Sequence, residues 1–513
     1  MKQLDVKSIP GVSDLPSLHG VYTGEYVNKN LNTLMEKEKR ENKIVKDLEK
    51  AIELTGLQNG MTISFHHHFR DGDYIVNMVL DRLAHMGFRD LVVAASSLTD
   101  CHESMVEHIQ NGVVKRIETS GLRGKLAEAV SDGLMDLPVV FRSHGGRAYA
   151  IETRELPIDV AFLGAPSSDP FGNANGYARD TEHDVICGAM GYAKSDSMYA
   201  KQTIVITNHI THYPNMPFGI SEMGVDYIVV VDEIGDPKGI MKGATRFTQN
   251  PKELLIAETC ANVIESAGLL QNNFSMQMGS GGASLAVARF LRKKMLDQNI
   301  KARFALGGIT GQIVEMHKEG LIARILDVQS FDLAAAESLR DNRFHHQISA
   351  SYYASPGNIS AAVNQLDFVV LSALEIDLNF NVNVLTGSNG IIRGAIGGHP
   401  DTAAGAAAAI VVLPLTRGRI PCVVNKVNTV VTPGKTVDVL VTDQGVAVNP
   451  ARKDLEEKLN SRGIRTVTIE TLQQKAQQFV GIPRPIEYTE KIVGVVAYRD
   501  NSVIDVIRQV KGE

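Results

Sequence analysis

The sequence predicts an α/β fold made of two tandem, internally duplicated domains, each built on a mainly parallel sheet. Short apolar runs rich in β-branched residues alternate with helical segments along most of the 513-residue chain. Five segments of the first half recur in the same order in the second half. The chain is also long enough to form two or more domains, each with a core of its own.

The composition is that of a globular protein, and it argues against several classes of function. Apolar residues make up 44% of the chain and charged residues 21%. Tryptophan is absent, aromatic residues reach only 6%, and the net charge is −6, which disfavours nucleic acid and membrane surfaces as partners. The cysteines have no zinc-type spacing, so we expect reduced thiols and no bound metal: Cys101, Cys187, Cys260 and Cys422.

No targeting or membrane segment is apparent. The N-terminus contains Asp5, Lys7 and Asp14 and lacks the apolar stretch of a secretory signal. The longest apolar stretch, residues 402–415, is rich in alanine and shorter than the ~20 residues that cross a bilayer. We therefore expect a soluble, cytoplasmic protein.

Residues 1–57 are predicted to form a helical N-terminal extension. Apolar residues recur at near-helical spacing between positions 34 and 52, and Gly56 suits the C-cap of that helix. The many charges of segment 36–50 fit a solvated helix face, and a docking arm for another subunit is the alternative.

The internal repeat divides the rest of the chain. We expect a first domain at 58–232, a linker with the helix that leads into the second domain at 233–269, and a second domain at 270–513. The tail after about 450 is predicted to close the second domain with a helix, a strand and a strand–helix pair. The matching segments are 60–69 with 274–282, 111–120 with 319–330, 157–175 with 365–383, 188–207 with 394–413, and 225–232 with 437–443.

Positions where the two copies differ are candidates for chemistry, because a duplicated fold needs only one set of reactive groups. In the gapless match of 157–175 with 365–383, Glu375 falls opposite Ser167. Both follow an apolar strand, at the end where parallel sheets carry their sites. A carboxylate there can act as nucleophile, base or electrostatic anchor, and a salt-bridged structural carboxylate is the alternative.

The two copies of the repeat differ most in the loop that follows their first matched strand. The second copy has the glycine-rich turn Gly279, Ser280, Gly281 and Gly282, whose amides suit an anion or an oxyanion. The first copy has His66, His67, His68 and Arg70 instead, a donor-rich set for carboxylates. Three adjacent histidines cannot all face one way, which disfavours a metal site. Close helix packing at the glycines and a polar loop at the domain interface are the alternatives.

A third candidate region is GGHPDTAAGA (397–406), in which glycines precede a helix of small residues. Such glycines allow a backbone to approach a ligand closely, and helix packing is the alternative. Arg393 can pair with a phosphate or carboxylate, and Asn389 lies in an Asn-Gly turn. With Gly397, Gly398 and Asp401 they form the candidate carrier-binding set. We expect one cleft between the domains to be lined by His66–Arg70, Ser167, Gly279–Gly282, Glu375 and Gly397–Gly398.

Together these motifs resemble the coenzyme A transferase superfamily and, within it, the family of citrate lyase alpha chains. In the second copy the resemblance rests on QMGSGGASLAVARFL, SALEIDL, GGHPDTAAGA and VDVLVTDQGVAV. In the first copy it rests on FHHHFRDGDY and PIDVAFLGAPSSDPFGNANGY. It covers roughly residues 55–450. FHHHF replaces the glycine loop that ordinary members of the superfamily carry in the first domain.

The resemblance implies two coenzyme A transferase-like domains and a transferase subunit of a citrate lyase complex. The implied reaction converts acetyl-carrier protein and citrate to citryl-carrier protein and acetate, through a mixed anhydride. The implied partners are an acyl carrier protein with a phosphoribosyl-dephospho-coenzyme A arm and a citryl lyase subunit, in an oligomer without a permanently bound cofactor. Glu375 stands where relatives carry a glutamate that forms a covalent thioester. A free coenzyme A transferase, a thioester hydrolase, a citramalate-specific enzyme and an inert scaffold remain the rivals.

Overall fold

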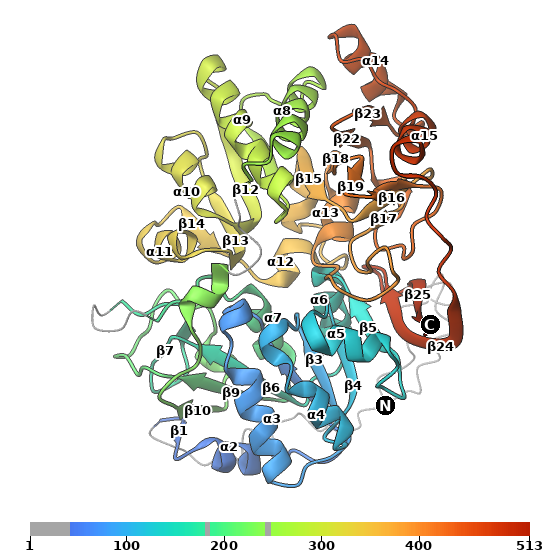
Figure 1. Ribbon diagram of the computed structural model, residues 1–513. Helices are drawn as coiled ribbons and strands as arrows, with labels where there is room; N and C mark the ends of the chain where they lie inside the picture. Colours follow the sequence, from blue (N-terminus) through green and yellow to red (C-terminus); the bar gives the residue numbers. More distant parts are fainter. Residues whose placement is uncertain (1–41, 180–184, 242–247, 513) are drawn as a thin grey trace, which may run out of the picture. The chain divides into compact units, whose positions relative to one another are not determined.

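The computed structural model describes residues 42–179, 185–241 and 248–512, and Lys43–Glu513 pack as one compact unit. The helix expected between positions 34 and 52 therefore lies partly outside the described residues. Two large sheets organise the compact unit (Figure 1). Smaller hairpins lie beside them.

The first sheet has ten strands, and nine of them run parallel. Its spatial order is β1 (Ile44–Val45), β10 (Tyr227–Val230), β9 (Gln202–Thr207), β6 (Val160–Ala165), β2 (Thr62–Phe65), β3 (Leu91–Ala95), β4 (Val114–Thr119), β5 (Val139–Arg142), β24 (Tyr488–Ala497) and β25 (Val503–Val510). Only β25 is antiparallel to its neighbour.

The second sheet has eight strands, and seven of them run parallel. Its order is β14 (His345–Gln347), β13 (Ile325–Ser330), β12 (Ala302–Ile309), β11 (Phe274–Met278), β15 (Phe368–Ser372), β18 (Ala408–Val412), β22 (Val439–Thr442) and β23 (Gly445–Val448). The last strand, β23, is antiparallel to β22.

The two sheets confirm the duplication strand by strand. The order β10-β9-β6-β2-β3-β4-β5 of the first sheet repeats as β22-β18-β15-β11-β12-β13-β14 in the second. A small antiparallel hairpin follows the equivalent strands β6 and β15. Ser167 pairs with Asn175 in the hairpin of β7 (Ser167–Ser168) and β8 (Ala174–Asn175), and Glu375 pairs with Asn383 in that of β16 (Glu375–Asp377) and β17 (Val382–Asn383). Glu375 and Ser167 are thus structurally equivalent, as the gapless match predicts.

The helices follow the same plan, because parallel strands need crossover connections. In the first half they are α2 (Leu48–Thr55), α3 (Ile75–His85), α4 (Met105–Gln110), α5 (Gly124–Ser131), α6 (His144–Glu152) and α7 (Gly191–Tyr199). In the second half they are α8 (Pro251–Ser266), α9 (Gly282–Gln298), α10 (Gly311–Lys318), α11 (Leu333–Asp341), α12 (Ala350–Ala354), α13 (His399–Gly405), α14 (Lys453–Ser461) and α15 (Ile469–Val480).

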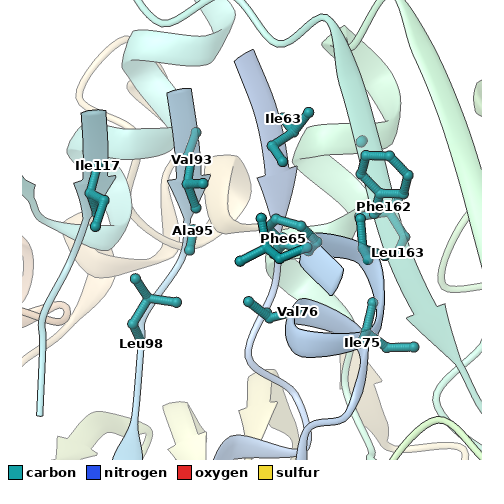
Figure 2. Close-up of a cluster of buried hydrophobic side chains, with 14 of the residues drawn as sticks. Ile63, Phe65, Ile75, Val76, Val93, Ala95, Leu98, Ile117, Phe162 and Leu163 are labelled. Atoms are coloured by element: carbon teal, nitrogen blue, oxygen red, sulfur yellow. The ribbon is translucent and has the colours of Figure 1, made fainter. Parts of the chain in front are cut away.

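Apolar side chains between the strands and helices form the cores. Figure 2 shows the first core, where Ile63 and Phe65 of β2 lie near Val93 of β3 and Phe162 of β6. The rings of Phe65 and Phe162 stack with centroids 5.8 Å apart. Burying one such side chain fully stabilises the fold by roughly 1.5–3 kcal/mol, so this packing fixes the strand ends from which the site loops emerge.

The start of the described chain differs in part from the expected extension. Ile44 and Val45 form β1, which pairs with β10, rather than a helical turn. The helix begins only after Asp47, whose carboxylate accepts the amide of Lys50. It ends at Gly56, which adopts the left-handed conformation with φ of 67°, so the predicted C-cap is confirmed.

The end of the chain corrects our expectation for the tail. Helices α14 and α15 pack on the second half, but β24 pairs in parallel with β5 of the first sheet. Residues 503–510, expected to be helical, form β25 after a turn in which Asn501 has φ of 67°. Figure 1 shows this red hairpin beside β5. The hairpin covers an edge of the first sheet that would otherwise expose unpaired backbone groups.

Candidate functional site

A cavity of about 430 Å³ lies between the two halves of the compact unit. Loops at the carboxyl ends of β2, β3 and β4 line it from the first half, and loops after β11, β13 and β15 line it from the second. This is the edge at which parallel sheets place their ligands. The duplicated architecture therefore brings two equivalent sets of loops onto one site.

The lining of the cavity is rich in positive charge and in hydrogen-bond donors. Four arginines contribute to it, and none of the described residues in the wall is an aspartate or a glutamate. An anion with several carboxylates suits such a wall, because each arginine can bind a carboxylate through two N–H groups. The basic and imidazole side chains are Arg70, Arg123, Arg393, Arg417, His67, His144 and His399.

Of the three consecutive histidines, only His67 lines the cavity. The rings of His66 and His68 lie against each other, with centroids 3.9 Å apart, and are buried away from it. Burial lowers the pKa of His66 to about 4 and also lowers the pKa of His67. At neutral pH these two rings are therefore uncharged.

His67 belongs to a stack of rings in the wall. Its ring lies 5.1 Å from that of Tyr192 and 5.8 Å from that of His144, centroid to centroid. Burial and the neighbouring Arg147 lower the pKa of His144 to about 3. Arg147 itself donates two hydrogen bonds to Asp196, at 2.6 and 2.8 Å, which neutralises its charge beneath the stack.

Arg70 is held in an unusual backbone conformation with its charge only partly satisfied. It has φ of 54°, and its carbonyl accepts hydrogen bonds from the Thr99 hydroxyl and the Cys101 thiol. The guanidinium lies 4.9 Å from the centre of the Phe331 ring, and Nη1 is buried without a partner among the described residues. Burial and Arg123 lower its pKa to about 10, so it stays protonated at neutral pH. Such an unpaired cationic N–H group favours binding of an anion.

The glycine-rich turn after β11 lines the cavity from the second half. The Ser284 hydroxyl is within 2.8 Å of the carbonyls of both Gly279 and Gly281, which fixes the turn from below. A Cβ atom on Gly281 would lie 2.2 Å from the Ser372 hydroxyl, so only glycine fits there. In the described part of the chain no acceptor meets the amides of Ser280 and Gly281. Gly279 to Gly281 line the cavity, whereas Gly282 begins α9.

Glu375 is buried beside the cavity, directly after the lining residue Leu374. Its Oε1 accepts hydrogen bonds from the side-chain amide of Asn383 at 2.9 Å and the backbone amide of Asn428 at 2.6 Å. Burial raises its pKa. The side chain is only 7% exposed and does not itself line the cavity.

The equivalent residue of the first half, Ser167, is fully buried and has a structural environment. Its hydroxyl donates to the carbonyl of Tyr177 at 2.6 Å and accepts from the side-chain amide of Asn215 at 3.0 Å. Ser167 does not line the cavity. The two copies therefore differ here in chemistry as well as in sequence.

The candidate carrier-binding residues fall into two groups. Arg393, Gly397 and Gly398 line the cavity, whereas Asn389 is exposed and does not. Asp401 is buried and joins the halves, because it accepts the Ser143 hydroxyl and the Gly145 amide, both at 2.9 Å. Burial raises the pKa of Asp401 to about 6.

Several wall residues escaped the sequence analysis. Arg123, His144 and Tyr192 come from the first half, and Tyr353 and Arg417 from the second. Arg123 follows the end of β4, which is the kind of position that the strand pattern could have indicated. The other four lie in helices or in a distant hairpin, so only the three-dimensional fold brings them to the site.

The described residues contain neither a cluster suited to a metal ion nor a helix suited to crossing a membrane. No cluster of three or more histidine, cysteine, aspartate or glutamate side chains there has a geometry suited to a metal ion. No helix in this part of the chain combines the length and the apolar character needed to cross a membrane.

Comparison with known proteins gives consistent matches over nearly the whole chain. The family model described as citrate lyase, alpha subunit, matches residues 41–510. The chain is 58% identical to the citrate lyase alpha chain of Klebsiella pneumoniae, over 93% of either chain. It is 55% identical to that of Escherichia coli strain K12, over 95% of this chain and 94% of the relative.

Solved structures agree. The chain is similar to the alpha subunit of citrate lyase from Streptococcus mutans, crystallised in complex with citrate. The TM-score is 0.89 and the identity 55%, over 93% of this chain and 92% of that one. A malonate decarboxylase alpha subunit from Acinetobacter baumannii, at 13% identity and a TM-score of 0.64 over 88% of this chain and 89% of that one, shares the fold.

Proposed function

The chain belongs to the family of citrate lyase alpha subunits, and from this premise we propose that it exchanges acetate for citrate on the thioester of an acyl carrier protein. The substrates are acetyl-carrier protein and citrate, and the products are citryl-carrier protein and acetate. The observation that carries the proposal is the cavity wall, with four arginines and no acidic residue among its described members. Citrate carries up to three carboxylates and needs such a counter-charge.

The reaction proposed here has two acyl-transfer steps. In the first, a citrate carboxylate attacks the acetyl carbonyl, the resulting oxyanion collapses, and the carrier thiolate leaves, which forms a citryl–acetyl mixed anhydride. In the second, the thiolate attacks the citryl carbonyl of the anhydride and acetate leaves. No oxidant, reductant or additional proton is consumed. The protein has to orient two anions and stabilise two oxyanions.

The two walls suit these two tasks. Arg70 and Arg123 supply positive charge for the carboxylates of citrate. Nη1 of Arg70, which has no partner among the described residues, supports this role. The amides of Ser280 and Gly281, which meet no acceptor in the described part of the chain, are suited to an oxyanion, because such donors stabilise charge that develops in the transition state. His67 lies in the same wall as Arg70.

The carrier arm is a second polyanion, and the site has separate cations for it. Arg393 and Arg417 are exposed in the second half while still lining the cavity. Arg417 donates to the carbonyls of Ala373 and Leu374, at 2.6 and 2.8 Å, which orients its guanidinium. We assign these two arginines to the phosphates of the arm, with Gly397 and Gly398 allowing close approach. The arm is a substrate of this chain and not a cofactor bound to it.

The proposed partners follow from the same premise. Relatives of this chain are named as the alpha chain of citrate lyase, so we propose that it works beside an acyl carrier protein and a citryl lyase subunit. The carrier protein presents the thioester, and the lyase subunit receives the citryl product. The complex is proposed to act in the cytoplasm.

A transfer assay with the full chain tests the function. Purified protein is incubated with acetyl-carrier protein or acetyl-coenzyme A, and with citrate or citramalate as acceptor. Release of acetate that depends on citrate, with formation of the citryl thioester, is the expected result. Citrate-independent hydrolysis of the thioester would identify a hydrolase, and a preference for citramalate would identify the five-carbon acid as the substrate.

The role of Glu375 separates direct attack from a covalent route. A glutamyl thioester would form with acetyl-coenzyme A alone and would be trapped by hydroxylamine or borohydride. Direct attack is favoured because Glu375 accepts two hydrogen bonds, is largely buried and does not line the cavity. We therefore expect no adduct, and we expect Glu375→Gln to slow transfer by no more than about 10²–10⁴-fold. A labelled thioester on Glu375 would refute direct attack.

A further inference from the structure

Ser96 is a buried residue outside the cavity wall that makes two contacts with His67. Its hydroxyl accepts the backbone amide of His67 at 3.1 Å and lies 2.5 Å from Nδ1 of the same imidazole. Ser96 is fully buried at the end of β3, and its own backbone amide donates to the carbonyl of Phe65. The hydroxyl is therefore held in one place relative to the ring.

These contacts decide which ring nitrogen carries the proton. The Ser96 hydroxyl already accepts a hydrogen bond from an N–H group, and its own proton needs an acceptor. Among the described residues, Nδ1 of His67 is the only acceptor within reach of that hydroxyl. The hydroxyl therefore donates to Nδ1, and a neutral imidazole with an unprotonated Nδ1 carries its proton on Nε2.

Nε2 of His67 is available to a ligand. The ring lines the cavity, and no described residue forms a hydrogen bond with Nε2, which is also not a fully buried atom. The carbonyl of His67 accepts the side chain of Gln329 from the second half at 2.8 Å, which fixes the backbone. The Tyr192 ring, 5.1 Å away, restricts rotation of the imidazole.

The surroundings of the ring keep it neutral. Burial lowers its pKa well below the usual value, and His144, Arg70, His66 and Arg147 act in the same direction. Asp196 on α7 is paired with Arg147 and so adds no free negative charge beside the ring. The wall around it contains no acidic residue among those described.

We propose that Ser96 is a positioning residue that fixes His67 as a neutral Nε2–H donor to the oxyanion formed on the thioester carbonyl. This inference rests on the proposed function, which supplies the oxyanion. Arg70 and Arg123 already provide charge for the ground-state carboxylates of citrate. A neutral donor adds little to that ground-state binding and acts when the carbonyl oxygen becomes negative, so it accelerates the chemical step. His67 therefore stays a donor throughout and does not exchange its proton.

Kinetics of the full chain test the positioning role. Ser96→Ala leaves Nδ1 without its donor, and we expect kcat to fall about 10–100-fold with little change in KM for citrate. Ser96→Thr keeps the hydroxyl and is expected to recover most of kcat. The matched control is Ser64→Ala, which removes from the adjacent strand β2 a buried hydroxyl that has no hydrogen-bond partner among the described residues. Unchanged kcat in Ser96→Ala, or an equal loss in Ser64→Ala, would overturn the inference.

Two further readouts separate chemistry from folding. His67→Gln retains a neutral N–H donor and is expected to lose less kcat than His67→Ala, for which we expect a fall of about 10²–10³-fold. Nitrogen NMR of histidine-labelled protein, with His67 assigned through His67→Gln, should show protonated Nε2 and unprotonated Nδ1. A proton on Nδ1 would refute the inference whatever the activity. Failure of the wild-type chain to transfer citrate would instead refute the proposed function, together with the oxyanion role of His67.

Discussion

Arg70 combines three properties that are seldom found together: a left-handed backbone, a buried guanidinium and an N–H group without a partner in the described structure. The left-handed conformation of a residue other than glycine costs of order 1–3 kcal/mol. Hydrogen bonds to its carbonyl from Thr99 and Cys101 offset part of that cost. The chain thus maintains a strained loop that points one cation at the cavity. Binding of a carboxylate would supply the missing hydrogen-bond partner.

Replacing Arg70 by lysine should therefore weaken citrate binding although the charge is conserved. Lysine cannot form the planar, two-pronged contact with a carboxylate or stack on the Phe331 ring. We expect Kd for citrate to rise by about 10–100-fold, which corresponds to ~1.4–2.8 kcal/mol, as measured by isothermal titration calorimetry. The matched control is Arg343→Lys, which alters an exposed arginine 4.8 Å from the ring of Phe344. Equal affinity in Arg70→Lys and wild-type protein would contradict the role of Arg70.

At the residue scale the sequence indicated which loops lie at the cavity, but not which side chains of those loops face it. The histidine run and the glycine turn both lie at the cavity, because they follow equivalent strands. Which of the three histidines faces it depends on backbone angles after β2, and these are set by tertiary contacts such as the one between Gln329 and the His67 carbonyl. Glu375 was identified by its register opposite Ser167. Its hydrogen bond from Asn428 could not be foreseen, because that residue is 53 positions away.

At the scale of single elements, the glycine-rich turn before α9 depends on very close packing. Ser284 bonds two carbonyls of the turn, and the Ser372 hydroxyl lies 3.0 Å from that of Ser284. The Ser372 side chain occupies the space in which a side chain on Gly281 would have to sit, and the Ser284 hydroxyl holds that side chain in place. These contacts stabilise the conformation of the turn in which the amides of Ser280 and Gly281 meet no acceptor among the described residues.

Gly281→Ala should displace the turn. A new Cβ would lie 2.2 Å from the Ser372 hydroxyl and 2.6 Å from its Cβ, so the backbone has to move. We expect kcat for transfer to fall by about 10²–10³-fold and stability to fall by about 1–3 kcal/mol. The second change Ser372→Gly removes the clashing atoms, so the double variant should recover part of kcat. No recovery, with the fold intact by circular dichroism, would argue against this steric explanation.

The C-terminal hairpin is the element whose place the sequence did not predict. Its first strand could be recognised by its β-branched residues, whereas its second strand was expected to be a helix. The partner strand β5 lies about 350 residues earlier in the chain. When two strands are this far apart in the chain, no local sequence pattern indicates that they pair. The match of 157–175 with 365–383 succeeded because the repeat supplied an internal reference, and the hairpin has no counterpart in that repeat.

Deleting residues 487–513 should expose the edge of the first sheet. β5 would lose its neighbour β24, and the amide of Val430 would lose its hydrogen bond to Asp505, which is 2.7 Å long. We expect the shortened chain to aggregate, because an uncovered strand edge pairs readily with other chains. Size-exclusion chromatography with light scattering measures this. A control that ends after Val510 keeps both strands and should elute like the full chain.

At the scale of the whole compact unit, the site exists only because its two halves are held together. Residues of both halves line the cavity, and neither half contains all the arginines. Several contacts cross the junction: His144 donates its amide to the carbonyl of Gly397, and Gln329 donates to that of His67. Asp401 adds two more, to Ser143 and Gly145, directly beside His144.

The repeat predicted that two domains would share one cleft. The residues that join them could not be predicted, because they have no motif of their own.

Asp401 should make the stability of the protein depend on pH in a defined direction. Burial raises its pKa to about 6 in the folded protein, against about 3.9 in an unfolded chain. The folded state therefore binds this proton more tightly. The stability that the folded protein gains from the protonated Asp401 side chain is fully present below pH 4 and is lost as the pH rises through about 6.

Asp401→Asn removes this titration, so the difference in unfolding free energy, variant minus wild type, should rise between pH 4 and about 6.5 and then level off. At low pH the variant should be no more stable than the wild type, because both side chains are then uncharged. Urea unfolding at closely spaced pH values measures the difference, and other titrating groups cancel in it. The control is Asp341→Asn, since that exposed carboxylate pairs with Arg340 and has a lowered pKa. For Asp341→Asn, the difference in unfolding free energy, variant minus wild type, should fall as the pH rises. A flat difference for Asp401→Asn would show that Asp401 does not titrate with a raised pKa at this junction.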